Sequence, residues 1–298
     1  MKYYLGIDGG GTRTTAAVSE ENGKLLFKAV GKSINFYSVG FEKARENLKD
    51  VINDIYENIG EIKFESAFIG CSALDNEATN DTITALCDGI INTKKIGMNS
   101  DVYVALASSG EDKNRVVAIC GTGSIVTGID ESGNIKTKGG WGHIFGDEGS
   151  AYSIAVNALK ASAMLYDEGK ITPLVKKAEE FFGVVDFREA IDKIYSPETT
   201  KDILASFSVK VGEIAEEDFV AKTVIVNEAH FFSKTVLALL NEIKNCTLIS
   251  LYGGVFQNNR LFRNSFIDDI KEFHSDLKIE MLTLPPEEGA LKIAREMQ

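Results

Sequence analysis

The first eighteen residues most constrain how this chain can fold. Residues 3–8 (YYLGID) and 14–18 (TTAAV) are short apolar runs separated by GGGTR at residues 9–13. Such runs on either side of a glycine turn predict a β-hairpin whose tip carries no bulky side chain. Glycines can take positive φ there and present consecutive backbone N–H groups, which together form a concavity for anions. The hairpin tip therefore predicts a polyphosphate site.

Asp8 ends the first strand beside this turn, where its carboxylate would repel a bare phosphate. A hydrated Mg²⁺ between them removes the conflict, because Mg²⁺ is held by one or two carboxylates together with substrate phosphates. Two familiar nucleotide motifs are excluded. The sequence lacks G-x-x-x-x-G-K-[ST], and the dinucleotide fingerprint needs a helix directly after its glycines, where this chain continues as a strand. A flexible hairpin turn that binds no ligand is the alternative interpretation.

The second half of the chain repeats this pattern. Three predicted strands at residues 116–120, 125–129 and 135–138 are joined by GTGS at 121–124 and ESGN at 131–134. The glycines of the first of these turns lie 112 positions after Gly9 and Gly11. A three-strand order that recurs with both turns in place predicts a duplicated domain.

The remaining elements follow from hydrophobic periodicity, and they predict an α/β protein with domains at residues 1–112 and 113–298. The predicted helices lie at 41–59, 80–91, 102–107, 258–273 and 288–297, with further strands at 66–70, 96–98, 248–252 and 277–282, and largely helical sequence at 151–242.

Composition narrows the possible partners and the compartment. The formal net charge of −12 opposes binding to nucleic acid or to an anionic membrane, because both require clustered Lys and Arg. No signal peptide precedes the first strand and no apolar run is long enough to cross a bilayer, so we expect a cytoplasmic protein. Reduced thiols are expected for the four widely spaced cysteines, Cys71, Cys87, Cys120 and Cys246.

Several motifs together resemble one family. They are GIDGGGTR at residues 6–13, GTGS at 121–124, GWGHIFGDEGS at 140–150 and PEEGA at 286–290. In these motifs the chain resembles the N-acetylglucosamine kinase branch of the BadF/BadG/BcrA/BcrD ATPase family, within the actin, sugar kinase and Hsp70 superfamily. The resemblance implies duplicated ribonuclease H-like (actin-like ATPase) domains flanking a nucleotide cleft. It also implies ATP and Mg²⁺ as cofactors, a small-molecule amino sugar as substrate, and a homodimer.

The same resemblance implies a role for each matching residue. Asp8 would hold the hydrated Mg²⁺, and Asp101 would be the catalytic base and contact the substrate. The ATP phosphates would be bound by Gly9, Gly10, Gly11, Thr12, Arg13, Gly121, Thr122, Gly123 and Ser124, and the adenosine by Gly253 and Gly254. The acceptor sugar would be contacted by Asn35, Asp101, Gly140, Trp141, Gly142 and Asp147.

Physical chemistry supports these roles and leaves alternatives. A sugar hydroxyl is a poor nucleophile, so a carboxylate such as Asp101 is the expected proton acceptor, although Asp101 could instead be a helix N-cap. Asn35 and Asp147 could cap loops, and Trp141 could stack on a sugar or merely pack. Lys and Arg are scarce near residues 140–150, which disfavours a strongly anionic acceptor.

The resemblance therefore implies an ATP-dependent amino-sugar kinase that phosphorylates the 6-hydroxyl of N-acetylglucosamine or a close relative. Three rivals remain. An activator ATPase for a 2-hydroxyacyl-CoA dehydratase or benzoyl-CoA reductase needs interface cysteines for an iron–sulfur cluster. A sugar-responsive transcription regulator needs a DNA-binding module. A filament-forming actin-like protein would use the same nucleotide site without an acceptor.

Overall fold

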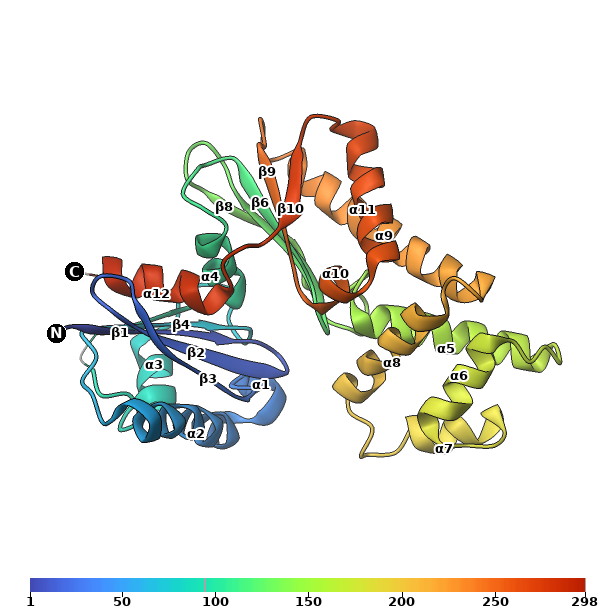
Figure 1. Ribbon diagram of the computed structural model, residues 1–298, viewed down its shortest axis with the longest axis horizontal. Helices are drawn as coiled ribbons and strands as arrows, with labels where there is room; N and C mark the ends of the chain where they lie inside the picture. The colour runs from blue at the N-terminus through green and yellow to red at the C-terminus, as the bar shows by residue number, and fades with distance from the viewer. Residues whose placement is uncertain (94, 298) are drawn as a thin grey trace. The chain divides into compact units, whose positions relative to one another are not determined.

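The computed structural model describes residues 1–93 and 95–297, which form two compact units (Figure 1). Unit 1 comprises Met1–Asp112 together with the C-terminal segment that begins at Leu282, and unit 2 comprises Lys113–Met281. The sequence analysis placed that C-terminal segment in the second domain, so this part of the prediction was wrong. The physical reason is that helix α12 (Pro286–Glu296) buries Ala290, Leu291 and Ala294 in one cluster with strand residues of unit 1.

The sheet of unit 1 has the strand order β3-β2-β1-β4-β5. Strand β1 pairs antiparallel with β2 and parallel with β4, and β3 and β5 extend the sheet on either side. The bounds are β1 Tyr3–Gly9, β2 Arg13–Glu20, β3 Leu25–Lys32, β4 Ser66–Cys71 and β5 Ile96–Asn99.

The sheet of unit 2 has the order β10-β9-β6-β7-β8, which is the same arrangement with β6 in the place of β1. Strand β6 again pairs antiparallel with the next strand and parallel with β9. The bounds are β6 Arg115–Cys120, β7 Ser124–Ile129, β8 Ile135–Gly139, β9 Leu248–Tyr252 and β10 Lys278–Met281. The predicted duplication is therefore confirmed as a repeat of the whole sheet.

Helices cover both faces of the first sheet. The amphipathic α2 buries a stripe at helical spacing, including Ala44, Leu48 and Ile55, while α12 and α4 pack on the opposite face (Figure 1). Gly60 with positive φ ends α2, as expected of a residue that tolerates that conformation. The bounds are α1 Phe36–Val39, α2 Phe41–Ile59, α3 Asn80–Cys87 and α4 Asp101–Ser108.

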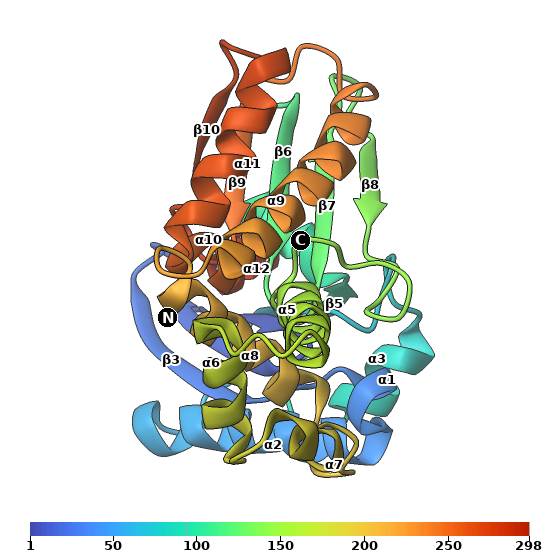
Figure 2. The same ribbon diagram turned by 90° about the vertical axis from the view of Figure 1, so that its right-hand side faces the viewer.

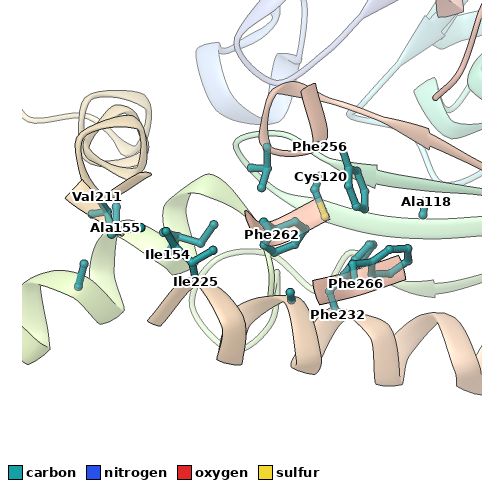
Figure 3. Close-up of a cluster of buried hydrophobic side chains, with 14 of the residues drawn as sticks. Ala118, Cys120, Ile154, Ala155, Val211, Ile225, Phe232, Phe256, Phe262 and Phe266 are labelled. Carbon is teal, nitrogen blue, oxygen red and sulfur yellow. The ribbon is translucent and has the colours of Figure 1, made fainter. Parts of the chain in front are cut away.

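The largest core lies in unit 2, where α9 and α11 run along the sheet (Figure 2). Phe232, Phe256, Phe262 and Phe266 meet there beside Cys120 at the end of β6 (Figure 3). Full burial of one such ring stabilises the fold by about 1.5–3 kcal/mol. The bounds are α5 Ala151–Asp167, α6 Pro173–Phe182, the 3₁₀ helix η1 Phe187–Glu189, α7 Ala190–Ile194, α8 Lys201–Ile214, α9 Phe219–Leu240, α10 Gly254–Asn258 and α11 Arg260–Phe273. Within the described residues, no helix combines the length and apolar character needed to cross a membrane.

Candidate active site

The first glycine turn joins β1 to β2, and its tip is exposed at Gly11, Thr12 and Arg13. Gly9, Gly10 and Gly11 do not have positive φ, so the turn does not use the backbone freedom that the sequence analysis invoked. The space around each residue explains these glycines instead. A Cβ on Gly11 would meet no protein atom within 4 Å, whereas one on Gly9 would press against the Ile34 side chain at 2.5 Å. The open side of Gly11 leaves room for a ligand to approach the backbone.

Asp8 lies one residue before this turn, in register with Thr15 on β2 and with Gly70 on β4. Burial raises the pKa of Asp8 well above its usual value, and the Asp101 and Glu287 carboxylates raise it further. Carboxylates crowded in a partly buried place are the oxygen donors that a divalent cation such as Mg²⁺ prefers. Among the described residues, however, no group of three or more His, Cys, Asp or Glu side chains is placed to hold a metal ion, so the metal role of Asp8 stays a prediction.

Asp101 is the first residue of α4 and follows the N-cap Ser100, so the N-cap interpretation of Asp101 was wrong by one position. A Cβ on Gly70 would lie 3.3 Å from the Asp101 Cα, which shows how closely α4 approaches the strand beside Asp8. Burial raises the pKa of Asp101 to about 6, against the lowering effect of backbone N–H groups of Val102 and Asp101 itself. A carboxylate with this pKa is ionised at neutral pH and still accepts a proton readily.

Asn35 is buried and caps the short helix α1. Its Oδ1 accepts hydrogen bonds from the Tyr37 and Ser38 amides at 3.1 Å each, and its Nδ2 donates to Ser72 Oγ at 3.0 Å. The loop-cap interpretation is thus realised, and contact of Asn35 with a sugar stays a prediction.

Two serines that the sequence analysis did not select tie Asn35 to the glycine turn. Ser33 Oγ donates to the Gly10 carbonyl at 2.9 Å and accepts from the Asn35 amide at 3.0 Å. The Ser72 amide donates to the Gly9 carbonyl at 2.9 Å. No motif marks these serines, because their partners in the glycine turn lie 23 and 63 residues away in the chain.

The second glycine turn, residues 121–124, is tied to the loop that follows β8. The Ala151 amide donates to the Gly121 carbonyl at 2.9 Å, and Ser124 Oγ donates to the Glu148 carbonyl at 2.7 Å. The buried Ser124 hydroxyl, predicted to face the phosphates, therefore holds this loop. A Cβ on Gly121 would meet no protein atom within 4 Å, but one on Gly123 would lie 2.9 Å from Asp147 Oδ2.

Residues 139–150, called here the tryptophan loop, owe their glycines to backbone conformation. The loop has left-handed φ at Gly139, Gly140, Gly142, Asp147 and Gly149. Side chains strongly disfavour that region, so the motif needs glycine at most of these positions. Asp147 is the exception, with φ of 60° and its carbonyl accepting from the Ser150 amide at 3.0 Å. Its buried carboxylate pairs with Lys201 Nζ at 3.3 Å rather than capping the loop.

Trp141 does not pack into a core, because 68% of its surface is exposed. Its ring lies 6.5 Å from that of Phe145, which is also exposed. The rings of His143 and Tyr152 meet in a T-shaped arrangement with their centroids 4.9 Å apart. The tryptophan loop thus carries an exposed indole, Trp141, and a buried carboxylate, Asp147, and an aromatic face and an acceptor are groups that a sugar site can use.

Two charged residues from the helical segment hold this loop, and the sequence analysis missed both. Glu228 on α9 is buried and accepts from the Gly149 amide at 2.7 Å and from Asn157 Nδ2 at 2.5 Å. Lys201 begins α8 and pairs with Asp147. The sequence could have indicated Glu228, because a carboxylate within the largely apolar residues 219–240 needs a buried partner. The sequence shows few cations near this motif, and the structure adds one, Lys201, which lies 54 residues away in the chain.

Gly253 and Gly254, predicted at the adenosine, lie in the turn from β9 to α10. Gly253 has φ of 104°, and a Cβ there would collide with the Cys120 carbonyl, so packing alone requires this glycine. At Gly254 the nearest atom to a Cβ would be Asn258 Nδ2 at 3.7 Å, which leaves that position more open.

Two α/β units with the same strand order, each opening with a glycine-turn hairpin, define the class of fold. A solved structure from Chromobacterium violaceum, assigned as an N-acetylglucosamine kinase, shares this fold with a TM-score of 0.80. It is 20% identical in sequence, and the likeness covers 98% of this chain and 99% of that one.

The family follows from sequence. The model of the BadF/BadG/BcrA/BcrD ATPase family matches residues 5–291, so this chain belongs to that family. It is 30% identical over 302 residues to an N-acetylmuramic acid/N-acetylglucosamine kinase of Clostridium acetobutylicum, with 99% of each chain covered. It is 28% identical over 312 residues to an N-acetyl-D-glucosamine kinase of Dictyostelium discoideum, covering 98% of this chain and 97% of the relative.

Proposed function

We propose that this protein is an amino-sugar kinase that transfers the γ-phosphoryl group of ATP to the 6-hydroxyl of N-acetylglucosamine or a close relative. The observation that carries the proposal is the half-buried Asp101 carboxylate, placed at the start of α4 close enough to Asp8 to raise the pKa of that carboxyl. Whole-length similarity to two curated sugar kinases supports it.

Asp101 acts as the base in this proposal. It accepts the proton of the 6-hydroxyl while that oxygen forms a bond to the γ-phosphorus and the bond from phosphorus to the β-phosphate oxygen breaks, so that ADP leaves. A loose transition state of this kind needs positioning and charge neutralisation more than covalent help from the protein. Mg²⁺ held near Asp8 would supply part of that neutralisation when bound.

The glycine turns bind the phosphates in this proposal. Gly9 to Arg13 and Gly121 to Ser124 would contribute backbone amides, apart from that of Gly121, which donates to the Gly123 carbonyl at 2.9 Å, and the open sides of Gly11 and Gly121 support a close approach. Gly253 and Gly254 would lie at the adenosine. Asn35, Asp147 and the loop around Gly140, Trp141 and Gly142 would bind the acceptor sugar, supported by the buried Asp147 carboxylate and the exposed indole.

The groups around Asp147 bear on which amino sugars the site could accept. Lys201 places a cation beside the tryptophan loop, so an anionic amino sugar such as N-acetylmuramic acid belongs among the candidates with N-acetylglucosamine and glucosamine. The sequence likewise left N-acetylglucosamine, N-acetylmuramic acid and glucosamine open as acceptors.

The activator ATPase is the rival within the same family, and the cysteines disfavour it. Cys71, Cys87 and Cys120 are buried, and burial raises the pKa of Cys71 to about 11 and of Cys87 to about 12. An iron–sulfur cluster shared between subunits requires thiolates at a surface. These thiols are inward-facing core residues.

A coupled assay of ADP release over a panel of amino sugars tests the proposal. We expect turnover that depends on an added N-acetylhexosamine, with the product identified as the 6-phosphate by ³¹P NMR. Equal ATP hydrolysis with and without every sugar would overturn it. Family resemblance also supports a cytoplasmic homodimer as part of the proposal, and sedimentation equilibrium measures the assembly state.

A further inference from the structure

A cation from the helical segment reaches the acceptor loop. Lys201 is the first residue of α8, directly after the N-cap Thr200, whose side chain accepts from the Ile203 amide at 3.4 Å. Helix α8 is anchored by its buried Phe207 and Val211, which belong to the core of unit 2. Its first turn is thereby held where Lys201 Nζ lies 3.3 Å from Asp147 Oδ2, across 54 residues of sequence.

The two members of this pair differ in exposure. The Asp147 side chain is 6% exposed and that of Lys201 is 33% exposed. A buried carboxylate needs a charged or hydrogen-bonding partner, because burial without one is strongly unfavourable. Lys201 is also held from a second side, since its Nζ lies 5.8 Å from the centre of the Tyr152 ring, within the range of a cation–π contact.

On its other side the Asp147 carboxylate occupies space that a side chain at Gly123 would fill. The ideal Cβ position on Gly123 lies 2.9 Å from Asp147 Oδ2, so this oxygen fits between the second glycine turn and Lys201. The backbone of Asp147 is itself in the left-handed region, with φ of 60°. Removal of the Lys201 ammonium group would leave the buried charge of Asp147 without a partner. The Asp147 carboxylate would then rotate away from its present position to lower that cost.

We propose that Lys201 is a positioning residue that holds the Asp147 carboxylate in the orientation that binds the acceptor sugar. This inference rests on the proposed function, in which Asp147 contacts the sugar. It assigns a role to the helical segment of unit 2, whose first turn of α8 supplies the ammonium group. Because Lys201 acts through Asp147, its loss changes sugar binding and leaves nucleotide binding intact.

Steady-state kinetics of Lys201→Met and Lys201→Arg test the proposal, with Lys210→Met as the matched control. Lys210 lies on the same helix and pairs with Glu213 at 2.8 Å on the surface. We expect Lys201→Met to raise the KM for the amino sugar about tenfold, because it removes one hydrogen bond to a charged group. The KM for ATP should stay within twofold. Lys201→Arg should recover most of the affinity, and Lys210→Met should match the unaltered protein.

A double-mutant cycle with Asp147→Asn separates positioning from direct contact. If Lys201 acts through Asp147, Lys201→Met adds little to the KM already raised in Asp147→Asn. Additive effects would overturn the proposal, as would an unchanged sugar KM or equal rises in both KM values. Should Lys201→Met fail to fold, Lys201→Gln carries the same test. Absence of sugar-dependent turnover in the unaltered protein would overturn the proposed function itself, a result distinct from an active protein that tolerates Lys201→Met.

Discussion

The two glycine turns occupy the same place in two copies of one sheet, yet they are held by different means. Short hydrogen bonds from Ser33 and Ser72 support the first turn. The second turn is held by the tryptophan loop, through the bond of Ser124 to Glu148, and by the start of α5, through Ala151, and that loop is held in turn by Glu228 and Lys201. Duplication supplied the turn twice, and insertion of a helical segment changed what surrounds the second copy.

Equivalent glycines show the same divergence. Gly11 and Gly123 match in the repeat, but a Cβ would meet open space at the first and the Asp147 carboxylate at the second. Gly9 and Gly121 reverse this, with the Ile34 side chain against the first and open space at the second. Glycine therefore leaves room for a ligand at one position and avoids a clash with protein atoms at the matching position. A motif match alone does not reveal which of these two reasons requires the glycine.

Replacement of the carboxylate in unit 1 should have the largest effect. Asp101→Asn keeps the size of the side chain but cannot accept the hydroxyl proton, so we expect kcat to fall by about 10²–10⁴-fold with ATP affinity unchanged. Asp147→Asn in unit 2 is the comparison, and it should raise the sugar KM with a much smaller loss of kcat. Stopped-flow and steady-state assays measure both. An Asp101→Asn variant with a third of normal turnover would remove Asp101 from the base role.

Substitution at the matched glycines should separate nucleotide binding from sugar binding. Gly11→Val projects into open space, so we expect an unchanged melting temperature and an ATP affinity about tenfold or more weaker, since the side chain occupies the proposed phosphate position. Gly123→Ala should instead displace Asp147 and weaken sugar binding. Isothermal titration calorimetry with each ligand measures the contrast. Equal effects of both variants on ATP would show that the two turns do not differ in this way.

The pH dependence should report on Asp101 in unit 1. Its pKa is raised to about 6, so the proton-accepting form is lost as pH falls through this value. The ratio kcat/KM reflects ionisations of the free enzyme, and we expect it to fall about tenfold per pH unit below about pH 6. Asp147→Asn should keep this acidic limb. A pH profile of Asp101→Asn that retains the same limb would assign it to another group.

The smallest effect on catalysis is expected where the C-terminal helix joins unit 1. Lys28 on β3 pairs with Glu287 at 3.0 Å and Glu288 at 2.7 Å on α12, and the Glu287 side chain is buried. Lys28→Met should lower the free energy of unfolding by about 1–2 kcal/mol, with kcat within twofold. Urea denaturation measures it, with Lys43→Met as the control for an exposed pair to Glu46. Equal stability of both variants would show that α12 does not depend on this contact.

Local patterns determined much of this fold. Apolar residues at helical spacing predicted α2 with the observed bounds, Phe41–Ile59. A short apolar run likewise predicted β9 as Leu248–Tyr252. Repeated glycine turns predicted the duplication, because a hairpin depends on residues that are neighbours in the chain. The motif at residues 140–150 also marked the loop that contains Asp147, because its glycines are required by left-handed backbone conformations at their own positions.

Tertiary structure alone decided the contacts made by these elements. The amphipathic pattern of α12 shows that one face is buried but not against which sheet, and the structure places that face in unit 1. Asn35 became a cap bonded to Ser72, and Lys201 became the partner of Asp147, through contacts 37 and 54 residues apart. An ion pair or side-chain hydrogen bond depends on distances of a few ångströms, and only the packing of helices and strands brings such distant residues that close.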